Sequence, residues 1–225
     1  MGADDPCGRR PANGPLQTVP VRPISPRMPI DPTTHSNVLA FGDSLTAGYG
    51  LAPADSFPAQ LQALLRRKRP HAHVINAGVS GDTSASGRAR LPRVLSRLTV
   101  QPDLAIVELG ANDLLRGIAP ARMRDNLDAI LDQLADCGIP ALLAGMQAPP
   151  FLGGFAREYD AVFTGLAAAH RVPLYPFFLA GVVGDRALVL ADGIHPNARA
   201  IGIVARAILP HVEAAIDAVE QARAA

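Results

Sequence analysis

Short apolar segments alternate with longer segments of helical character from residue 37 onward, and this alternation limits the possible folds more than any other feature of the chain. The segment 103–109 is nearly all apolar, as expected for a strand that is covered on both faces. In 120–137 the apolar residues recur at helical spacing, and Gly138 follows as a stop signal. The repeated β-α order predicts an α/β fold with a parallel sheet and helices on both faces. We expect strands at 37–41, 73–77, 103–109, 141–146 and 172–175, and helices at 55–67, 88–97, 120–137, 155–170 and from 197 toward the C-terminus, the last interrupted by Pro210.

The N-terminal segment differs from the rest of the chain. Prolines from Pro6 to Pro32 recur too closely for a helix or a central strand. We therefore divide the chain into a disordered or wrapping tail, residues 1–36, and one folded domain, residues 37–225. The tail shows no apolar signal region, so a cytoplasmic location is the default expectation. A periplasmic or secreted location is expected if the true start differs.

Composition narrows the functional class. The 225 residues carry a formal net charge of +1, which gives no reason to expect a nucleic-acid partner. No apolar run reaches the roughly 18 residues of a membrane span. Hydrophobic residues make up 48% of the chain, enough for a core without a metal or disulfide staple. No cofactor is expected, and the oligomeric state is left open.

Polar motifs follow the predicted strands, where open α/β sheets form their sites. Gly42–Thr46 follows the first strand and contains Ser44, Leu109–Asp113 follows the third and contains Asn112, and Asp192–Pro196 precedes the last helix. Each motif alone also fits an ordinary turn, and an Asp with a His also fits a metal site. A fourth, glycine-rich motif, 76–84, follows the second strand and can bring the Gly81 N–H close to a ligand.

Together these motifs supply the groups that acyl transfer needs. Ser44 can act as nucleophile, His195 as its base, and Asp192 as the acid that fixes the His tautomer. The side chain of Asn112 and the N–H of Gly81 can donate to an oxyanion. Asp43 and Asp113, within the same motifs, are interpreted as supports of the turns.

The chain resembles the GDSL family, also called SGNH hydrolases, and within it the arylesterase and multifunctional thioesterase/lysophospholipase branch. The matching stretches are Phe-Gly-Asp-Ser-Leu-Thr-Ala-Gly-Tyr49, Ala-Gly-Val-Ser-Gly-Asp-Thr-Ser84, Val-Glu-Leu-Gly-Ala-Asn-Asp113 and Ala-Asp-Gly-Ile-His-Pro-Asn197, in the family's order. The resemblance implies a flavodoxin-like three-layer α/β/α sandwich with a five-stranded parallel sheet. It also implies a triad of Ser44, Asp192 and His195, and an oxyanion hole made by the Ser44 N–H, the Gly81 N–H and Asn112.

The expected reaction is hydrolysis of a small acyl ester through an acyl-serine intermediate. Short to medium acyl esters, aryl esters, acyl thioesters and lysophospholipids all fit an apolar pocket, for which we predict the lining residues Leu114, Phe151, Leu152 and Phe155. The phenylalanines can instead serve only to pack under their loop. A serine-dependent acyltransferase and a carbohydrate deacetylase remain alternatives on the same residues. A non-catalytic binding protein is disfavoured because no expected catalytic position is substituted.

Overall fold

A computed structural model describes residues 36–225 of the chain. The predicted tail, residues 1–36, lies outside this part except for Ser36. Ser36 is buried, and its carbonyl oxygen accepts a hydrogen bond of 2.8 Å from the His73 N–H.

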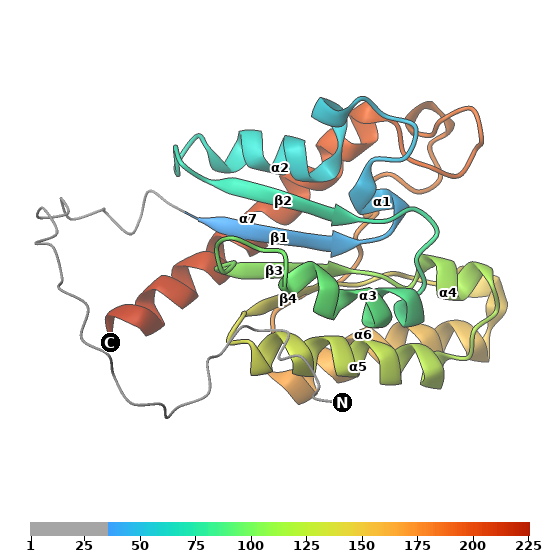
Figure 1. The fold of residues 1–225 in the computed structure, drawn as a ribbon. Coiled ribbons are helices and arrows are strands. Elements are labelled where there is room, and N and C mark those ends of the chain that lie inside the picture. Colours follow the sequence, from blue (N-terminus) through green and yellow to red (C-terminus); the bar gives the residue numbers. More distant parts are fainter. Residues whose placement is uncertain (1–35) are drawn as a thin grey trace, which may run out of the picture.

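All five strands run parallel in one sheet, in the order β2-β1-β3-β4-β5 (Figure 1). The strands are β1 (Asn37–Gly42), β2 (His73–Gly78), β3 (Leu104–Glu108), β4 (Ala141–Ala144) and β5 (Leu174–Tyr175). The chain moves outward from β1 to β2 and then returns past β1 to β3. This reversal places a topological switch point at the carboxyl ends of β1 and β3, where such sheets form their sites. The predicted α/β class and flavodoxin-like order are confirmed.

Helices form a layer on each side of the sheet. In Figure 1, α2 and α7 lie on one side, and α3, α5 and α6 lie on the other. Every residue of β3 is buried, which is the burial expected of a central strand with both faces covered. The main helices are α2 (Phe57–Leu65), α3 (Ser84–Leu95), α5 (Pro120–Asp136), α6 (Gly154–His170) and α7 (Ala198–Ala224).

Two predicted helices differ from those observed. The helix expected at 88–97 begins at Ser84, because the Thr83 side chain caps it by accepting from the Ser86 N–H. The predicted interruption at Pro210 is wrong, since α7 is one continuous helix. Pro210 is exposed, and buried apolar residues before and after it, Ile208 and Val212, hold both halves on the core. Among residues 36–225, no helix is long and apolar enough to cross a membrane.

Short helices occupy the carboxyl-end rim of the sheet. The bounds are α1 (Ser44–Ala47) after β1, α4 (Ala111–Leu115) after β3, and the 3-10 turns η2 (Pro53–Asp55), η3 (Pro150–Leu152) and η4 (Arg186–Leu188). Because α1 and α4 follow neighbouring strands, they bring Ser44 and Asn112 to the same edge of the sheet.

Candidate active site

Ser44 is the first residue of α1, directly after β1. Asp43 caps this helix, and its side chain accepts a 2.9 Å hydrogen bond from the Leu45 N–H. The cap turns the chain sharply at the end of the strand, so that Ser44 is 9% exposed. Its Oγ lies 3.2 Å from Nε2 of His195, within hydrogen-bond reach of a base.

His195 is oriented by Asp192, three residues earlier in the chain. Nδ1 of His195 lies 2.7 Å from Oδ2 of Asp192. The other carboxylate oxygen, Oδ1, accepts from the Ile194 N–H at 2.9 Å and from the His195 N–H at 3.0 Å. This pattern assigns the ring proton to Nδ1, which donates a hydrogen bond to the carboxylate, and leaves the lone pair of Nε2 to accept from Ser44. The structure thus brings together the three residues predicted to form a triad.

The same contacts keep Asp192 ionised. The two backbone N–H groups, and then the His195 side chain, lower the pKa of Asp192 from 3.8 to about 2. The ring of Tyr49 lies against the imidazole, with 4.3 Å between ring centroids and 35° between planes. Sequence reasoning gave Tyr49 no role. Within residues 36–225, no group of three or more His, Cys, Asp or Glu side chains is placed to hold a metal ion.

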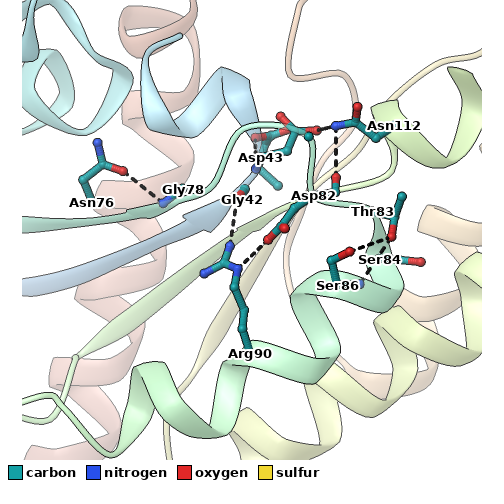
Figure 2. A network of polar contacts seen from close by, with 12 residues as sticks. Gly42, Asp43, Asn76, Gly78, Asp82, Thr83, Ser84, Ser86, Arg90 and Asn112 are labelled. Carbon is teal, nitrogen blue, oxygen red and sulfur yellow. Dashed lines mark hydrogen bonds and ion pairs between the residues drawn. The ribbon is translucent and has the colours of Figure 1, made fainter.

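Asn112, predicted as an oxyanion donor, lies in α4 and faces the nucleophile turn. Its Nδ2 donates to Oδ2 of Asp43 and to the carbonyl oxygen of Asp82, each at 3.0 Å. The amide carries two hydrogens, so both are used in this resting arrangement. Asn112 therefore joins the turn before Ser44 to the loop after β2, as Figure 2 shows.

Gly81, the other predicted donor, lies in that loop with φ +85°, in the left-handed region that favours glycine. Its carbonyl oxygen accepts a 2.8 Å hydrogen bond from Nη2 of Arg116, at the end of α4. The loop ends at Ser84, the first residue of α3, whose N–H and hydroxyl donate to the Asp113 carboxylate at 2.7 and 2.6 Å. Asp113 thus supports the start of α3, which agrees with its interpretation as a structural residue.

A fully buried carboxyl group, Glu108, lies beneath the nucleophile turn at the end of β3. Oε2 accepts from Thr46 Oγ1 at 2.8 Å and from the Asp43 N–H at 3.4 Å, whereas Oε1 has no hydrogen-bond partner. Burial, and next the nearby Asp43 carboxylate, raise the pKa of Glu108 well above its ordinary value. Burial also raises the pKa of Asp43, but Asp43 accepts from Leu45 and Asn112, which favour its charged form. We therefore assign the proton to Glu108 and the charge to Asp43. Sequence reasoning missed Glu108, although a carboxylate at the end of an otherwise apolar strand was a usable signal.

The four residues predicted to line a substrate pocket occupy two kinds of position. Leu114 and Phe155 are half-buried and pack on the hydrophobic core, and the Phe155 ring stacks on Tyr159 with centroids 6.5 Å apart. Phe151, on η3, is 85% exposed, and its neighbour Leu152 is 38% exposed. Their part in substrate binding remains a prediction.

Comparisons with known proteins identify relatives of this chain. Residues 40–200 match the model of the GDSL-like lipase/acylhydrolase family. Esterase TesA of Pseudomonas aeruginosa is 41% identical over 160 residues, covering 71% of this chain and 79% of the relative. Thioesterase 1/protease 1/lysophospholipase L1 of Escherichia coli K12 is 38% identical over 161 residues, covering 71% and 75%. The crystal structure of AlinE4, an SGNH-hydrolase family esterase, matches with a TM-score of 0.68 and 48% identity over 80% of this chain and 96% of that one.

Proposed function

The chain belongs to the GDSL-like lipase/acylhydrolase family and is a serine esterase, and we propose that it cleaves acyl esters with Ser44, His195 and Asp192 as its catalytic triad. One observation carries the assignment. A continuous chain of contacts, 3.2 Å and then 2.7 Å, runs from Ser44 Oγ through both ring nitrogens of His195 to the Asp192 carboxylate. This is the arrangement that activates a serine hydroxyl.

In the proposed reaction, Ser44 Oγ bonds to the acyl carbon while Nε2 of His195 takes its proton. The carbonyl electron pair moves to oxygen and forms a tetrahedral oxyanion. Collapse breaks the bond to the leaving oxygen or sulfur, which receives the proton from His195, and an acyl-Ser44 ester remains. Water then gives a proton to His195 and attacks the same carbon. Collapse breaks the bond to Ser44 Oγ, which takes the proton back from His195, and the acid is released.

The oxyanion would be bound by the N–H groups of Ser44 and Gly81 and by the Asn112 amide. Both hydrogens of that amide are used in the resting structure, so one contact must be exchanged when the oxyanion forms. The contact to the neutral carbonyl of Asp82 is the weaker one, because a hydrogen bond to the charged Asp43 carboxylate is stronger. We therefore expect the hydrogen that faces Asp82 to turn to the oxyanion.

The surface around the site supports an apolar substrate. Most exposed large apolar side chains of residues 36–225 lie in segments that follow strands, on the rim that carries Ser44. They are Tyr49, Val79, Leu115, Phe151, Leu152, Val183 and Ile194, and Val100 is the exception. We propose acyl or aryl esters with short to medium acyl chains as the substrate class, with acyl thioesters as the second candidate because a relative carries the name thioesterase.

The test is hydrolysis of p-nitrophenyl esters from acetate to palmitate, and of an acyl-CoA thioester, by wild type, Ser44→Ala and Ser96→Ala. Loss of the nucleophile should lower kcat by roughly 10⁶-fold. Ser96 lies at the exposed end of α3, and its hydroxyl donates to the Arg93 carbonyl oxygen, so its variant controls for the loss of a hydroxyl. Equal activity of Ser44→Ala and wild type would reject the assignment. An added alcohol that captures the acyl group in competition with water would instead favour a transferase.

A further inference from the structure

Arg90, on α3, lies beside the site and contacts both segments that carry the proposed backbone donors. Its Nη2 donates to the carbonyl oxygen of Gly42 at 2.9 Å, two residues before Ser44. Its Nε pairs with the carboxylate of Asp82, the residue after Gly81. Figure 2 shows the guanidinium between these two segments. Neither the charge pattern nor the spacing of Arg90 in the sequence pointed to this position.

The guanidinium also packs with its flat face on an aromatic ring. Its Cζ lies 4.1 Å from the centroid of the buried Phe41 ring, and the side chain is 19% exposed. A planar guanidinium can hold two acceptors at a set distance and stack on a ring at the same time, which a lysine ammonium cannot do. Arg90 therefore ties the Asp82 end of the loop after β2 to the end of β1.

We propose that Arg90 is a positioning residue for the oxyanion hole, which keeps the Gly81 N–H aligned with the Ser44 N–H while the intermediate forms. The proposal rests on the proposed function. Two side chains tie Asp82, the residue after Gly81, to the Ser44 turn: Asn112, through Asp43, and Arg90, through Gly42. On the other side of Gly81, the Val79 N–H also donates to the Gly42 carbonyl oxygen, at 3.0 Å. If Asn112 turns one hydrogen to the oxyanion, its link is opened during turnover. The Arg90 link then holds the two donors in place.

The position of the donors matters because an oxyanion hole acts through preorganised N–H groups that point at one place. A shift of about 1 Å in such groups costs on the order of 100-fold in rate. Arg90 contacts neither Ser44 nor His195, so its loss should weaken binding of the tetrahedral intermediate without changing the shape of the pH profile or the binding of the ground-state ester.

The variant for the test is Arg90→Lys, which keeps the positive charge beside Asp82 but cannot bridge to Gly42. Arg93→Lys, on an exposed position of the same helix, is the matched control. Active sites are counted with a fluorophosphonate that labels Ser44, so that misfolded protein does not enter the rate. Three quantities are compared: kcat and KM for p-nitrophenyl butyrate, the pH profile of kcat/KM, and the Ki of an alkyl trifluoromethyl ketone that forms a tetrahedral oxyanion on Ser44.

We expect Arg90→Lys to lower kcat per labelled site by about 10- to 100-fold, with KM and the acid limb of the pH profile unchanged. The Ki of the ketone should rise by the same factor as kcat falls. A merely structural role would lower the labelled fraction and leave Ki unchanged, which would overturn the proposal. So would a kcat and Ki within twofold of Arg93→Lys.

If Arg90→Lys does not fold, Asp82→Asn gives the same test from the other end of the link, since it removes the ion pair and keeps the contact to Gly42. An unchanged Ki in that variant overturns the proposal. Failure of the proposed function is separately visible, because wild type would then bind no ketone or Ser44→Ala would keep its turnover.

Discussion

The nucleophile and the base of this site are held in opposite ways. Asp43 and Glu108, beneath Ser44, are fully buried, whereas the Asp192 and His195 side chains keep 35% and 23% of their surface exposed. Ser44 is positioned by the end of a central strand and by a buried carboxyl group. His195 is positioned mainly by hydrogen bonds within the four residues that begin at Asp192.

The difference separates two requirements of the chemistry. Oxyanion donors must keep their geometry against developing charge, and a close-packed core resists displacement. A base must exchange protons with a leaving group and with water, which an exposed loop permits. Substitutions in the exposed loop of Asp192 and His195 should therefore alter the catalytic rate more than the stability. Substitutions in the buried layer beneath Ser44 should alter the stability as well.

Asp192→Asn should have the largest effect, on rate alone. The new side-chain amide can still accept from the two backbone N–H groups through its oxygen, but its NH₂ group would face Nδ1 of His195 and favour the tautomer whose Nε2 carries the proton. That tautomer cannot take the proton of Ser44. We expect kcat to fall by about 10²- to 10⁴-fold, while the melting temperature stays unchanged. The upper figure is the loss known for a fully buried triad acid, and Asp192 is partly exposed.

Asp185→Asn is the matched control, since Asp185 accepts from a backbone N–H in a similar turn, at Ala187, without a histidine partner. Steady-state kinetics and thermal unfolding of both variants provide the measurement. A melting temperature that drops only in Asp192→Asn would contradict the separation of rate from stability.

Gly42→Ala should have the next largest effect, on stability. A Cβ at Gly42 would lie 2.2 Å from Thr46 Oγ1 and 2.6 Å from both the carbonyl oxygen and Oε2 of Glu108. The backbone atom cannot move aside, so the free energy of unfolding should fall by about 3 kcal/mol or more. Gly193→Ala, in the exposed loop, meets no atom within 4 Å and bears only the cost of φ +72°, about 1–2 kcal/mol. Urea unfolding of the two variants measures the difference, and equal losses would show that the two sides are packed alike.

Much of the fold followed from the sequence, because burial on both faces leaves a recognisable apolar run in the inner strands β1, β3 and β4. Boundaries were less predictable. The start of α3 depends on the Thr83 cap. The continuity of α7 past Pro210 depends on the packing of Ile208 and Val212 against the core, which the sequence alone does not show. The five-residue helix α4 was not predicted, since its sequence carries too few residues to show a period.

The site also contains residues that the sequence predicted and residues that it did not. Asp192 and His195 are three residues apart, so local spacing was enough to predict their contact. Ser44 is 151 residues from His195, and their meeting was predicted from the placement of both motifs on one rim of the sheet and from the family resemblance. Glu108 and Arg90 act across distances of 62 residues, from Glu108 to Thr46, and 48 residues, from Arg90 to Gly42. Such contacts depend on strand order and helix placement, which no local pattern encodes.

Glu108→Gln should have the smallest effect, and it tests whether the buried carboxyl group is neutral. A carboxyl whose pKa is raised on folding binds its proton in the native state after the unfolded chain has lost it. Between the ordinary value of 4.5 and the raised value, the free energy of unfolding of wild type should therefore fall with rising pH, by about 1.4 kcal/mol per pH unit. Glutamine carries no proton to lose, so this slope should be absent in the variant.

Asp43 is present in both proteins, so the difference between their pH slopes reports on the titration of Glu108 and on its interaction with Asp43. Urea unfolding at pH 5, 6 and 7 should show the free energy of unfolding of Glu108→Gln rising relative to that of wild type as the pH rises above 5, whichever protein is more stable at pH 5. The exposed Glu158→Gln should follow wild type in parallel. Parallel curves for Glu108→Gln as well would mean that Glu108 is ionised in the native state. The charge beneath Ser44 would then be shared by two carboxylates, and the buried side of the site would repel the oxyanion as well as position its donors.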